Sequence, residues 1–402
     1  MSKISFTKSV IAELINNVPP GEQNVFSVAG DVNSDGFVDF VISGRNGRMV
    51  WLENKGKSGL WKEHLIDDVE CIECGGSLVD LTGNGYPDII NGGDWRSDEI
   101  WWWENPGGDK LNKTDHKWNK RLIMKTGAGQ IHDTLIGDIT GDGTPALIFT
   151  NQMQEGGATI FWVPLPKDPF VSPWPEAKKI AVKKTESNPL NNRRDDGLQP
   201  EEGLAIGDID GDGVNELVCG THWYKYDKST GTWKGHKFAK GYITTKCAIG
   251  DIDGDGRNEI ILSEGDPCIY GKIQGGKVSW FKPVGAMEQM WEEHILEDYL
   301  YDAHSLRVGD ICGNGRMDVF VGEAGYTDEQ RQYINRPPRL IVFENNGRGN
   351  FTRHVIDEGT GTHDAQLVDA MNRGVLDIIG KPIQGGEMWN VHVWYNNTKI
   401  TG

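Results

Sequence analysis

One short phrase recurs along the chain and restricts what it can fold into. Each copy holds an Asp, a turn rich in Asp, Asn and Gly, and in most copies a closing acid, with an apolar run on either side. The seven copies begin at Asp31, Asp80, Asp138, Asp208, Asp251, Asp310 and Asp369. Repeated supersecondary units of this size are the signature of stacked or ring-shaped architectures. The chain is therefore predicted to be a repeat protein.

The apolar runs beside each turn are rich in β-branched residues and predict strands. A second run follows the turn, a third run such as MVWLEN (49–54) comes next, and a fourth, amphipathic run such as WKEHLID (61–67) completes most units. Four short antiparallel strands are what one propeller blade contains. We expect an all-β protein, a seven-bladed β-propeller of four-stranded antiparallel blades that forms a single domain over residues 1–402.

The last unit lacks a fourth strand, because the chain ends soon after its third run, VHVWYN (391–396). An amphipathic run at the opposite end of the chain, SFTKSVIAE (5–13), can supply it. We expect this N-terminal strand to join the last blade, which closes the ring and leaves no open sheet edge.

The fourth and fifth copies, DIDGDGVNE (208–216) and DIDGDGRNE (251–259), resemble the FG-GAP or VCBS repeat, and the resemblance covers nearly all of the chain. It implies a seven-bladed propeller. Similar propellers occur as integrin heads, as adhesion and binding modules, as polysaccharide lyases and as the propeller domain of fungal aldos-2-ulose dehydratase. Because one fold carries all of these functions, the function has to be inferred from a site.

Composition excludes some partners. The chain has 41 Lys and Arg against 59 Asp and Glu, a net charge of −18, which argues against nucleic acid and anionic membranes as partners. No segment is long and apolar enough to span a membrane, and the N-terminus lacks the apolar core of a signal peptide. We expect a monomer that is cytoplasmic rather than secreted. The six cysteines are interpreted as buried free thiols.

Two repeat turns carry a full set of acids at alternating positions, a pattern that resembles calcium loops. Their acids are Asp208, Asp210, Asp212 and Glu216 in one turn and Asp251, Asp253, Asp255 and Glu259 in the other. Structural calcium is one interpretation. The other is that the carboxylates cap a tight turn by accepting backbone N–H groups.

Alignment of the repeats exposes a column of polar residues at the start of the first strand. Six residues before the first Asp of each copy stand Val25, Cys74, His132, Glu202, Thr245, His304 and His363. Ring geometry directs equivalent positions toward one axis, so we expect His132, Glu202, His304 and His363 to bind one divalent ion, Zn²⁺ or Ca²⁺, at the channel mouth. Catalytic histidines without a metal, and histidines that only line the channel, are the alternatives.

A second set of residues follows the second strand and should reach the same rim. We expect it to bind substrate through Arg45, Trp95, Arg96, Glu264, Glu323 and Lys381, with His222 and Tyr224 beside them. Insertions at about 164–200 and 325–339 are expected to roof this face, the second contributing Tyr326 and Arg331. Aromatic rings and charged groups together are typical of a sugar site.

These residue types suit β-elimination, in which a base removes a proton next to a carboxylate while cations stabilise the enolate. We expect a carbohydrate-active lyase acting on a uronate-containing saccharide, with His132, His222, Tyr224, Tyr326 and Arg331 as catalytic candidates. The resemblance to the propeller lyases and the dehydratase points to the same chemistry. A keto-sugar dehydratase and a non-catalytic glycan- or protein-binding propeller are the alternatives.

Overall fold

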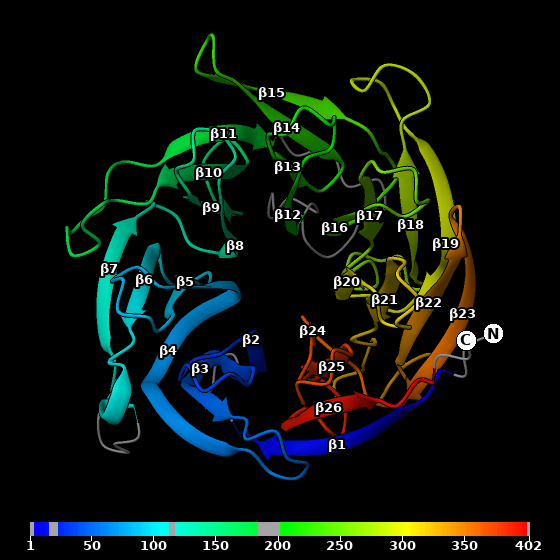
Figure 1. Cartoon of the computed structure of the whole chain (residues 1–402), viewed down its shortest axis with the longest axis horizontal. Coiled ribbons are helices and arrows are strands. Elements are labelled where there is room, and N and C mark those ends of the chain that lie inside the picture. Colours follow the sequence, from blue (N-terminus) through cyan, green and yellow to red (C-terminus); the bar gives the residue numbers. More distant parts are fainter. Residues whose placement is uncertain (1–3, 16–22, 112–116, 184–201, 400–402) are drawn as a thin grey trace.

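The computed structural model describes residues 4–15, 23–111, 117–183 and 202–399. These residues form antiparallel β-sheets, and their only helical element is a single turn of 3-10 helix, η1 (Gly108–Lys110). The sheets are arranged around a common centre (Figure 1). The fold class predicted from the repeats, an all-β propeller-type architecture of four-stranded sheets, is confirmed.

Five sheets have four strands each, which follow one another from the centre outward. Their strands are β24 (Gln366–Val368), β25 (Asp377–Gly380), β26 (Asn390–Asn396) and β1 (Phe6–Glu13); β8 (Ile131–Gly137), β9 (Ala146–Asn151), β10 (Ala158–Pro164) and β11 (Lys178–Lys183); β12 (Leu204–Gly207), β13 (Glu216–Cys219), β14 (His222–Asp227) and β15 (Thr232–Lys237); β16 (Lys246–Gly250), β17 (Glu259–Ser263), β18 (Gly276–Lys282) and β19 (Glu292–Leu300); and β20 (Ser305–Gly309), β21 (Asp318–Gly322), β22 (Arg339–Gly347) and β23 (Asn350–Glu358).

The sixth sheet has six strands because one long strand serves two neighbours. It contains β2 (Gln23–Gly30), β3 (Asp39–Glu53), β4 (Lys62–Val79), β5 (Asp88–Gly93), β6 (Glu99–Glu104) and β7 (Asn119–Lys125). The first part of β4, through Cys71, pairs with β3, and its second part, from Ile72, pairs with β5. The count of seven blades stays a prediction, because it depends on dividing this sheet at β4.

The N-terminal strand closes the ring as predicted. β1 pairs antiparallel with β26, with Phe6 opposite Asn396 and Glu13 opposite Asn390. The two strands lie side by side although they come from opposite ends of the chain (Figure 1). Their pairing covers the outer edge of β26, which would otherwise present unpaired N–H and C=O groups to solvent.

Part of the insertion predicted at 164–200 belongs to a sheet. Residues 178–183 form β11, the outer strand beside β10, with Ala158 opposite Lys183. The amphipathic pattern of this strand is weak, which explains why the sequence indicated a loop there. The rest of the insertion from residue 184 lies outside the described residues.

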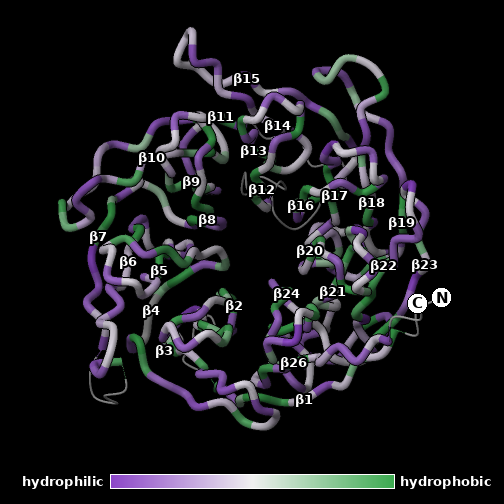
Figure 2. Tube along the Cα trace, viewed as in Figure 1, coloured by the Kyte–Doolittle hydropathy of each residue, from purple (hydrophilic) through white to green (hydrophobic). Residues whose placement is uncertain are grey.

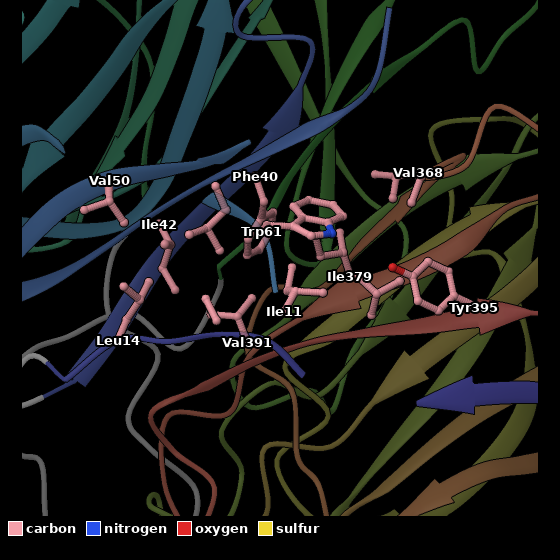
Figure 3. Packing of buried hydrophobic residues seen from close by; sticks show 14 residues of the cluster. Ile11, Leu14, Phe40, Ile42, Val50, Trp61, Val368, Ile379, Val391 and Tyr395 are labelled. Atoms are coloured by element: carbon pink, nitrogen blue, oxygen red, sulfur yellow. The ribbon is translucent and has the colours of Figure 1, made fainter. Parts of the chain in front are cut away.

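The apolar core fills the spaces between neighbouring sheets. Where the last sheet meets the first, Ile11, Phe40, Ile379, Val391 and Trp61 pack together, with Trp61 only 7% exposed (Figure 3). Each sheet thereby buries both of its faces against its neighbours. The inner strands therefore carry apolar side chains on both faces. Hydrophilic residues follow much of the outer rim, for example along β7 and β19 (Figure 2).

Buried asparagines at the end of the third strand tie neighbouring repeat turns together. Asn345 donates from Nδ2 to the Met317 carbonyl of its own turn, 3.0 Å away, and to the Ile252 carbonyl of the preceding turn, 2.7 Å away. Asn54, Asn105 and Asn396 make the same pair of bonds. These amides fasten the sheets at the turn end of the ring.

Among the described residues, no helix is long and apolar enough to cross a membrane. The ring has two ends, one with the repeat turns and one where the inner strands begin.

Candidate functional site

The polar column found by aligning the repeats lines a single cavity at the start of the inner strands. The cavity has a volume of about 260 Å³, and its walls include every column residue except Thr245. Thr245 lies just behind it, where its hydroxyl donates to the Glu202 carbonyl at 2.6 Å. The repeat turns stand at the far end of the same strands, so the two features occupy opposite ends of the ring.

His132, at the start of β8, is held between carboxylates. Its Nδ1 lies 2.8 Å from Asp133 Oδ2, and its Nε2 lies 3.4 Å from Glu202 Oε2. Burial alone would lower the pKa of His132, but the charges of Glu202 and Asp133 outweigh it and raise the pKa well above its usual value. This shift favours the protonated form of His132, and its contact with Asp133 sets the orientation of the ring.

His304 and His363, which precede β20 and β24, stack face to face. Their ring centroids are 3.9 Å apart, and His304 Nε2 lies 3.4 Å from Asp266 Oδ2 and 3.8 Å from Glu202 Oε2. Burial, together with the positive charge of His304 and Lys381, lowers the pKa of His363 well below its usual value. This shift favours the neutral form of the His363 imidazole.

Several polar atoms around this cavity are buried without a hydrogen-bond partner among the described residues. They are Oε2 of Glu202, Nδ1 of His304, Nδ1 of His363 and Oε2 of Glu73. Buried polar groups are nearly always hydrogen-bonded, and each exception calls for an explanation such as a bound ligand, ion or water. These four atoms make the cavity a candidate binding site.

A second buried group lies on β4, beside Cys74. The Cys74 thiol donates to Glu73 Oε1 at 3.0 Å, and Arg45 Nη2 donates to the same oxygen at 2.7 Å. Burial and the Glu73 carboxylate raise the pKa of Cys74 to about 11. Since Arg45 also lines the cavity, it brings a permanent positive charge to the channel mouth.

Further along the channel, a second cavity of about 370 Å³ continues below the first, lined by Lys246, Asp133, Asp364 and Arg307. Lys246 is buried and lies 3.9 Å from both Asp133 Oδ1 and Glu202 Oε2. Burial opposes the charge of Lys246, but Asp133 and Glu202 outweigh it and raise the pKa of this ammonium. The channel is therefore charged along its length.

Two groups of side chains at the mouth have ligand atoms within 4.8 Å of one another: Glu202, Asp266 and His304 in one, and Glu73, Cys74 and His132 in the other. The four residues predicted to share one ion are thus divided, with His304 and Glu202 in the first group and His132 in the second. His363 belongs to neither. Glu202 links the two groups, because its Oε2 lies 3.4 Å from Nε2 of His132 and 3.8 Å from Nε2 of His304.

Other predicted residues lie outside the cavity wall. His222 and Tyr224 are on β14, where the Tyr224 ring is buried in the core between two sheets and stacks with His222 at 6.2 Å. In the loop at 325–339, the Tyr326 carbonyl accepts the Ile334 N–H at 2.9 Å, and Arg331 lies against Met388. None of the four lines the cavity.

Three residues predicted to contact substrate are buried instead among loop backbone and charges. Glu264 accepts from Ile243 N, Lys277 N and Lys272 Nζ, and Glu323 accepts from Tyr301 N, Arg339 N and Arg336. Lys381 donates to the Val25 and His363 carbonyls, at 3.1 and 3.0 Å, and burial lowers its pKa to about 8. These groups hold the loops that shape the cavity.

Trp95 and Arg96 lie beside the mouth rather than in its wall. The Trp95 residue is 41% exposed, and its ring centroid lies 5.0 Å from Arg45 Cζ and 4.9 Å from Arg96 Cζ. Arg96 is also paired with Asp94. The exposed part of an indole is a surface that a sugar ring can contact.

Sequence reasoning missed Glu73, Asp133, Lys246 and Asp266. The first three stand one residue before or after the column, so the aligned repeats held the signal that would have found them. Asp266 comes two residues after Glu264, on a loop whose path the repeat does not specify.

Gly203, next to Glu202, has φ 81°, and a Cβ there would lie 2.9 Å from the Cys247 nitrogen. Glycine thus lets this strand approach its neighbour and brings Glu202 into the mouth.

At the other end of the ring, lysines lie among the acids of the predicted calcium turns. Lys225 contacts Asp210, Asp212 and Glu216, with Nζ 2.6 Å from Asp212 Oδ2, and Lys282 contacts Asp253 and Asp255. The closing acids Glu216 and Glu259 are buried and accept the Ile209 and Ile252 N–H groups. In each turn the closing acid caps the backbone. The ammonium of Lys225 lies among the acids of the turn 208–212, and that of Lys282 lies among those of the turn 251–255.

Comparison with known proteins agrees with this fold. Residues 208–262 match the family model described as an FG-GAP-like repeat. No protein of curated function matches the chain significantly.

Solved structures with the same fold include the biofilm matrix protein Bap1 of V. cholerae, at 10% identity and a TM-score of 0.52, covering 97% of this chain and 91% of that one. They also include BBS1N, crystallised in complex with ARL6DN, at 9% identity and a TM-score of 0.51, covering 97% of this chain and 95% of that one. Identities this low show the fold alone. The chain therefore carries an FG-GAP-like repeat within an all-β fold of the propeller type.

Proposed function

We propose that the protein is a carbohydrate lyase that carries out β-elimination on a uronate-containing saccharide at the channel mouth. The observation that carries the proposal is the cavity in which the buried imidazole of His363 lies with carboxylate and imidazole atoms that have no hydrogen-bond partner among the described residues, and with a permanent cation, Arg45. Elimination needs these three things together: a base, a group that stabilises the enolate, and a charge that binds the carboxylate.

The size of the cavity narrows the substrate. The volume of about 260 Å³ lies just below the ~300–1,000 Å³ typical of ligand pockets, so we infer that the cavity takes one sugar ring. We infer that one uronate unit enters the mouth and that the rest of the saccharide lies outside, with the exposed Trp95 ring as its stacking surface. A short oligosaccharide or a chain end fits this arrangement better than the interior of a long polymer.

The proposed step moves two protons, one to His363 and one from Tyr270, and breaks one C–H bond and one C–O bond. His363 removes the proton from the carbon next to the carboxylate, the C–H electrons form the new C=C bond, and the C–O electrons leave with the glycosidic oxygen. Tyr270, buried in the cavity wall, is the proposed proton donor to that oxygen. Arg45 pairs with the uronate carboxylate, and its charge stabilises the enolate that forms there.

The group of Glu202, Asp266 and His304 could hold a divalent ion beside this carboxylate. Their oxygen and nitrogen donors suit Zn²⁺ or a similar ion, and Oε2 of Glu202 is buried without a hydrogen-bond partner. A bound ion would act as a Lewis acid on the carboxylate. Without it, the same three side chains orient His363 through the stacked ring of His304.

A non-catalytic glycan-binding role is the second candidate, and the exposed Trp95 beside the mouth favours it, because contact with an aromatic ring binds sugars without any chemistry. A keto-sugar dehydratase would use the same base and the same cavity on a neutral substrate. The three differ in their products: an unsaturated uronate, a dehydrated keto-sugar, or none.

The test is incubation of the protein with a panel of uronate oligosaccharides and keto-sugars, with and without added Zn²⁺ or Ca²⁺. An increase in ultraviolet absorbance from an unsaturated uronate is expected with at least one oligosaccharide. Binding of a uronate without turnover would support the glycan-binding role, and turnover of keto-sugars alone would support the dehydratase.

A further inference from the structure

A compact group of three different donor atoms lies in the wall of the mouth, separate from Glu202, Asp266 and His304. It combines the thiol of Cys74, a carboxylate oxygen of Glu73 and a ring nitrogen of His132, and all three atoms lie within 4.8 Å of one another. All three residues are buried, with exposed fractions of 2%, 0% and 4%. The group is thus shielded from bulk water and contacts it only through the cavity.

Two further observations show that these atoms are prepared for a ligand. Glu73 uses Oε1 for Arg45, the Cys74 N–H and the Cys74 thiol, whereas its Oε2 is buried with no hydrogen-bond partner among the described residues. Asp133 Oδ2 lies 2.8 Å from His132 Nδ1, which leaves Nε2, 3.4 Å from Glu202 Oε2, as the nitrogen that can bind an ion. A carboxylate on the outer nitrogen of a histidine is the usual support of a metal-binding imidazole.

The donor set selects the kind of ion. One sulfur, one nitrogen and one oxygen suit a borderline ion such as Zn²⁺, whereas Mg²⁺ and Ca²⁺ prefer oxygen alone. Since Zn²⁺ lies ~2.0–2.3 Å from such ligands, side-chain shifts of about 1 Å would bring three atoms within 4.8 Å of one another onto one ion. Three protein ligands leave the fourth position of a tetrahedral site open.

We propose that Glu73, Cys74 and His132 form a thiolate-containing zinc site whose open position faces the channel mouth. On binding, the Cys74 S–H bond and the Nε2–H bond of protonated His132 break, both protons pass to solvent, and the thiolate sulfur and Nε2 bond to the ion. The His363 ring lies beside this site, with its Nε2 3.8 Å from Cys74 Sγ. The proposal concerns the metal site alone and does not depend on the lyase activity.

The experiment uses Co²⁺ as the probe, because cobalt bound to a thiolate shows a charge-transfer absorption band in the near ultraviolet. The full chain, freed of metal with a chelator, is titrated with Co²⁺ beside three variants: Cys74→Ser, Cys247→Ser and Glu202→Gln. We expect the band in the wild type, in Cys247→Ser and in Glu202→Gln, and its loss in Cys74→Ser. Cys247 is the matched control, since its thiol lies in the lower cavity.

Asp133→Asn keeps the three ligands and removes only the carboxylate that orients His132. We expect it to retain the band while Co²⁺ affinity falls ~10- to 100-fold. This variant keeps the proposal testable if Cys74→Ser does not fold, which circular dichroism would reveal. A band that persists in folded Cys74→Ser, a wild type that binds Co²⁺ without the band, or unchanged affinity in Asp133→Asn would overturn the proposal.

Discussion

The buried asparagine between repeat turns predicts a large loss of stability for one small substitution. Asn345 is 2% exposed and makes three side-chain hydrogen bonds: Nδ2 donates to Ile252 O and Met317 O, and Oδ1 accepts from Gly347 N at 2.8 Å. Asn345→Ala removes all three and leaves the Ile252 and Met317 carbonyls without this donor.

The magnitude follows from these bonds. A buried hydrogen bond contributes a net ~1 kcal/mol and an orphaned polar group costs more, so the free energy of unfolding should fall by about 3–4 kcal/mol. Unfolding entropy near ~2.1 cal/mol/K per residue gives ~0.8 kcal/mol/K for 402 residues, which converts this loss to a decrease of about 4 °C in Tm. Asn345→Asp should cost more, since a carboxylate would face the two carbonyls.

The assay is differential scanning calorimetry at one scan rate, with Asn346→Ala as the matched control. Asn346 is exposed and bonds only to Thr352 Oγ1, at 2.8 Å, so its loss should change the free energy of unfolding by less than ~0.5 kcal/mol. Equal Tm values for Asn345→Ala and Asn346→Ala would refute the idea that these amides fasten the sheets.

Three further predictions concern charges. Because Lys225 supplies positive charge to Asp210 and Asp212, wild-type Tm should be the same with calcium and with a chelator, whereas Lys225→Met should gain a calcium-dependent increase in Tm; calcium dependence in the wild type would contradict this. Burial raises the pKa of Glu259 from 4.5 to about 7. Between these two pH values the folded state binds more protons than the unfolded state. The protonated Glu259 therefore stabilises the fold below pH 4.5, and this contribution is lost as the pH rises through 7. In urea unfolding, the free energy of unfolding of Glu259→Gln should fall less than that of the wild type between these pH values. An equal decrease in the two proteins would exclude Glu259 as its source. Arg45→Met should lower the free energy of unfolding by ~3–5 kcal/mol by leaving the Glu73 charge buried and unpaired, and the double variant with Glu73→Gln should recover part of it in denaturant titrations; no recovery would contradict the pairing.

Repeat periodicity was enough to predict the fold class, the closing N-terminal strand and the cavity-lining column. The column was predictable because each inner strand is short and extended, so a fixed count back from the turn reaches the same height in every unit. His132, Glu202, His304 and His363 meet for this reason.

The partners of these residues were not predictable in the same way. Asp266 reaches the cavity from a loop that differs between units, and β11 (Lys178–Lys183) has little amphipathic pattern of its own. Glu264 and Glu323 look like site residues because they are charged and follow a strand, but their carboxylates hold loop N–H groups that no sequence pattern reveals. Lys225 and Lys282 lie a strand away from the acids that they neutralise, a pairing set by the sheet.

The most direct test of the proposed function is the rate of unsaturated-uronate formation by three proteins: wild type, His363→Ala and His294→Ala. His294 lies on the outer strand β19, where its ring stacks on Trp280 of β18, and it serves as a histidine control away from the mouth. The wild type and His294→Ala should form product at the same rate, and His363→Ala should be slower by ~100-fold or more, as expected for loss of a general base. Equal rates for His363→Ala and wild type, or no product from the wild type on any uronate, would contradict elimination at the channel mouth.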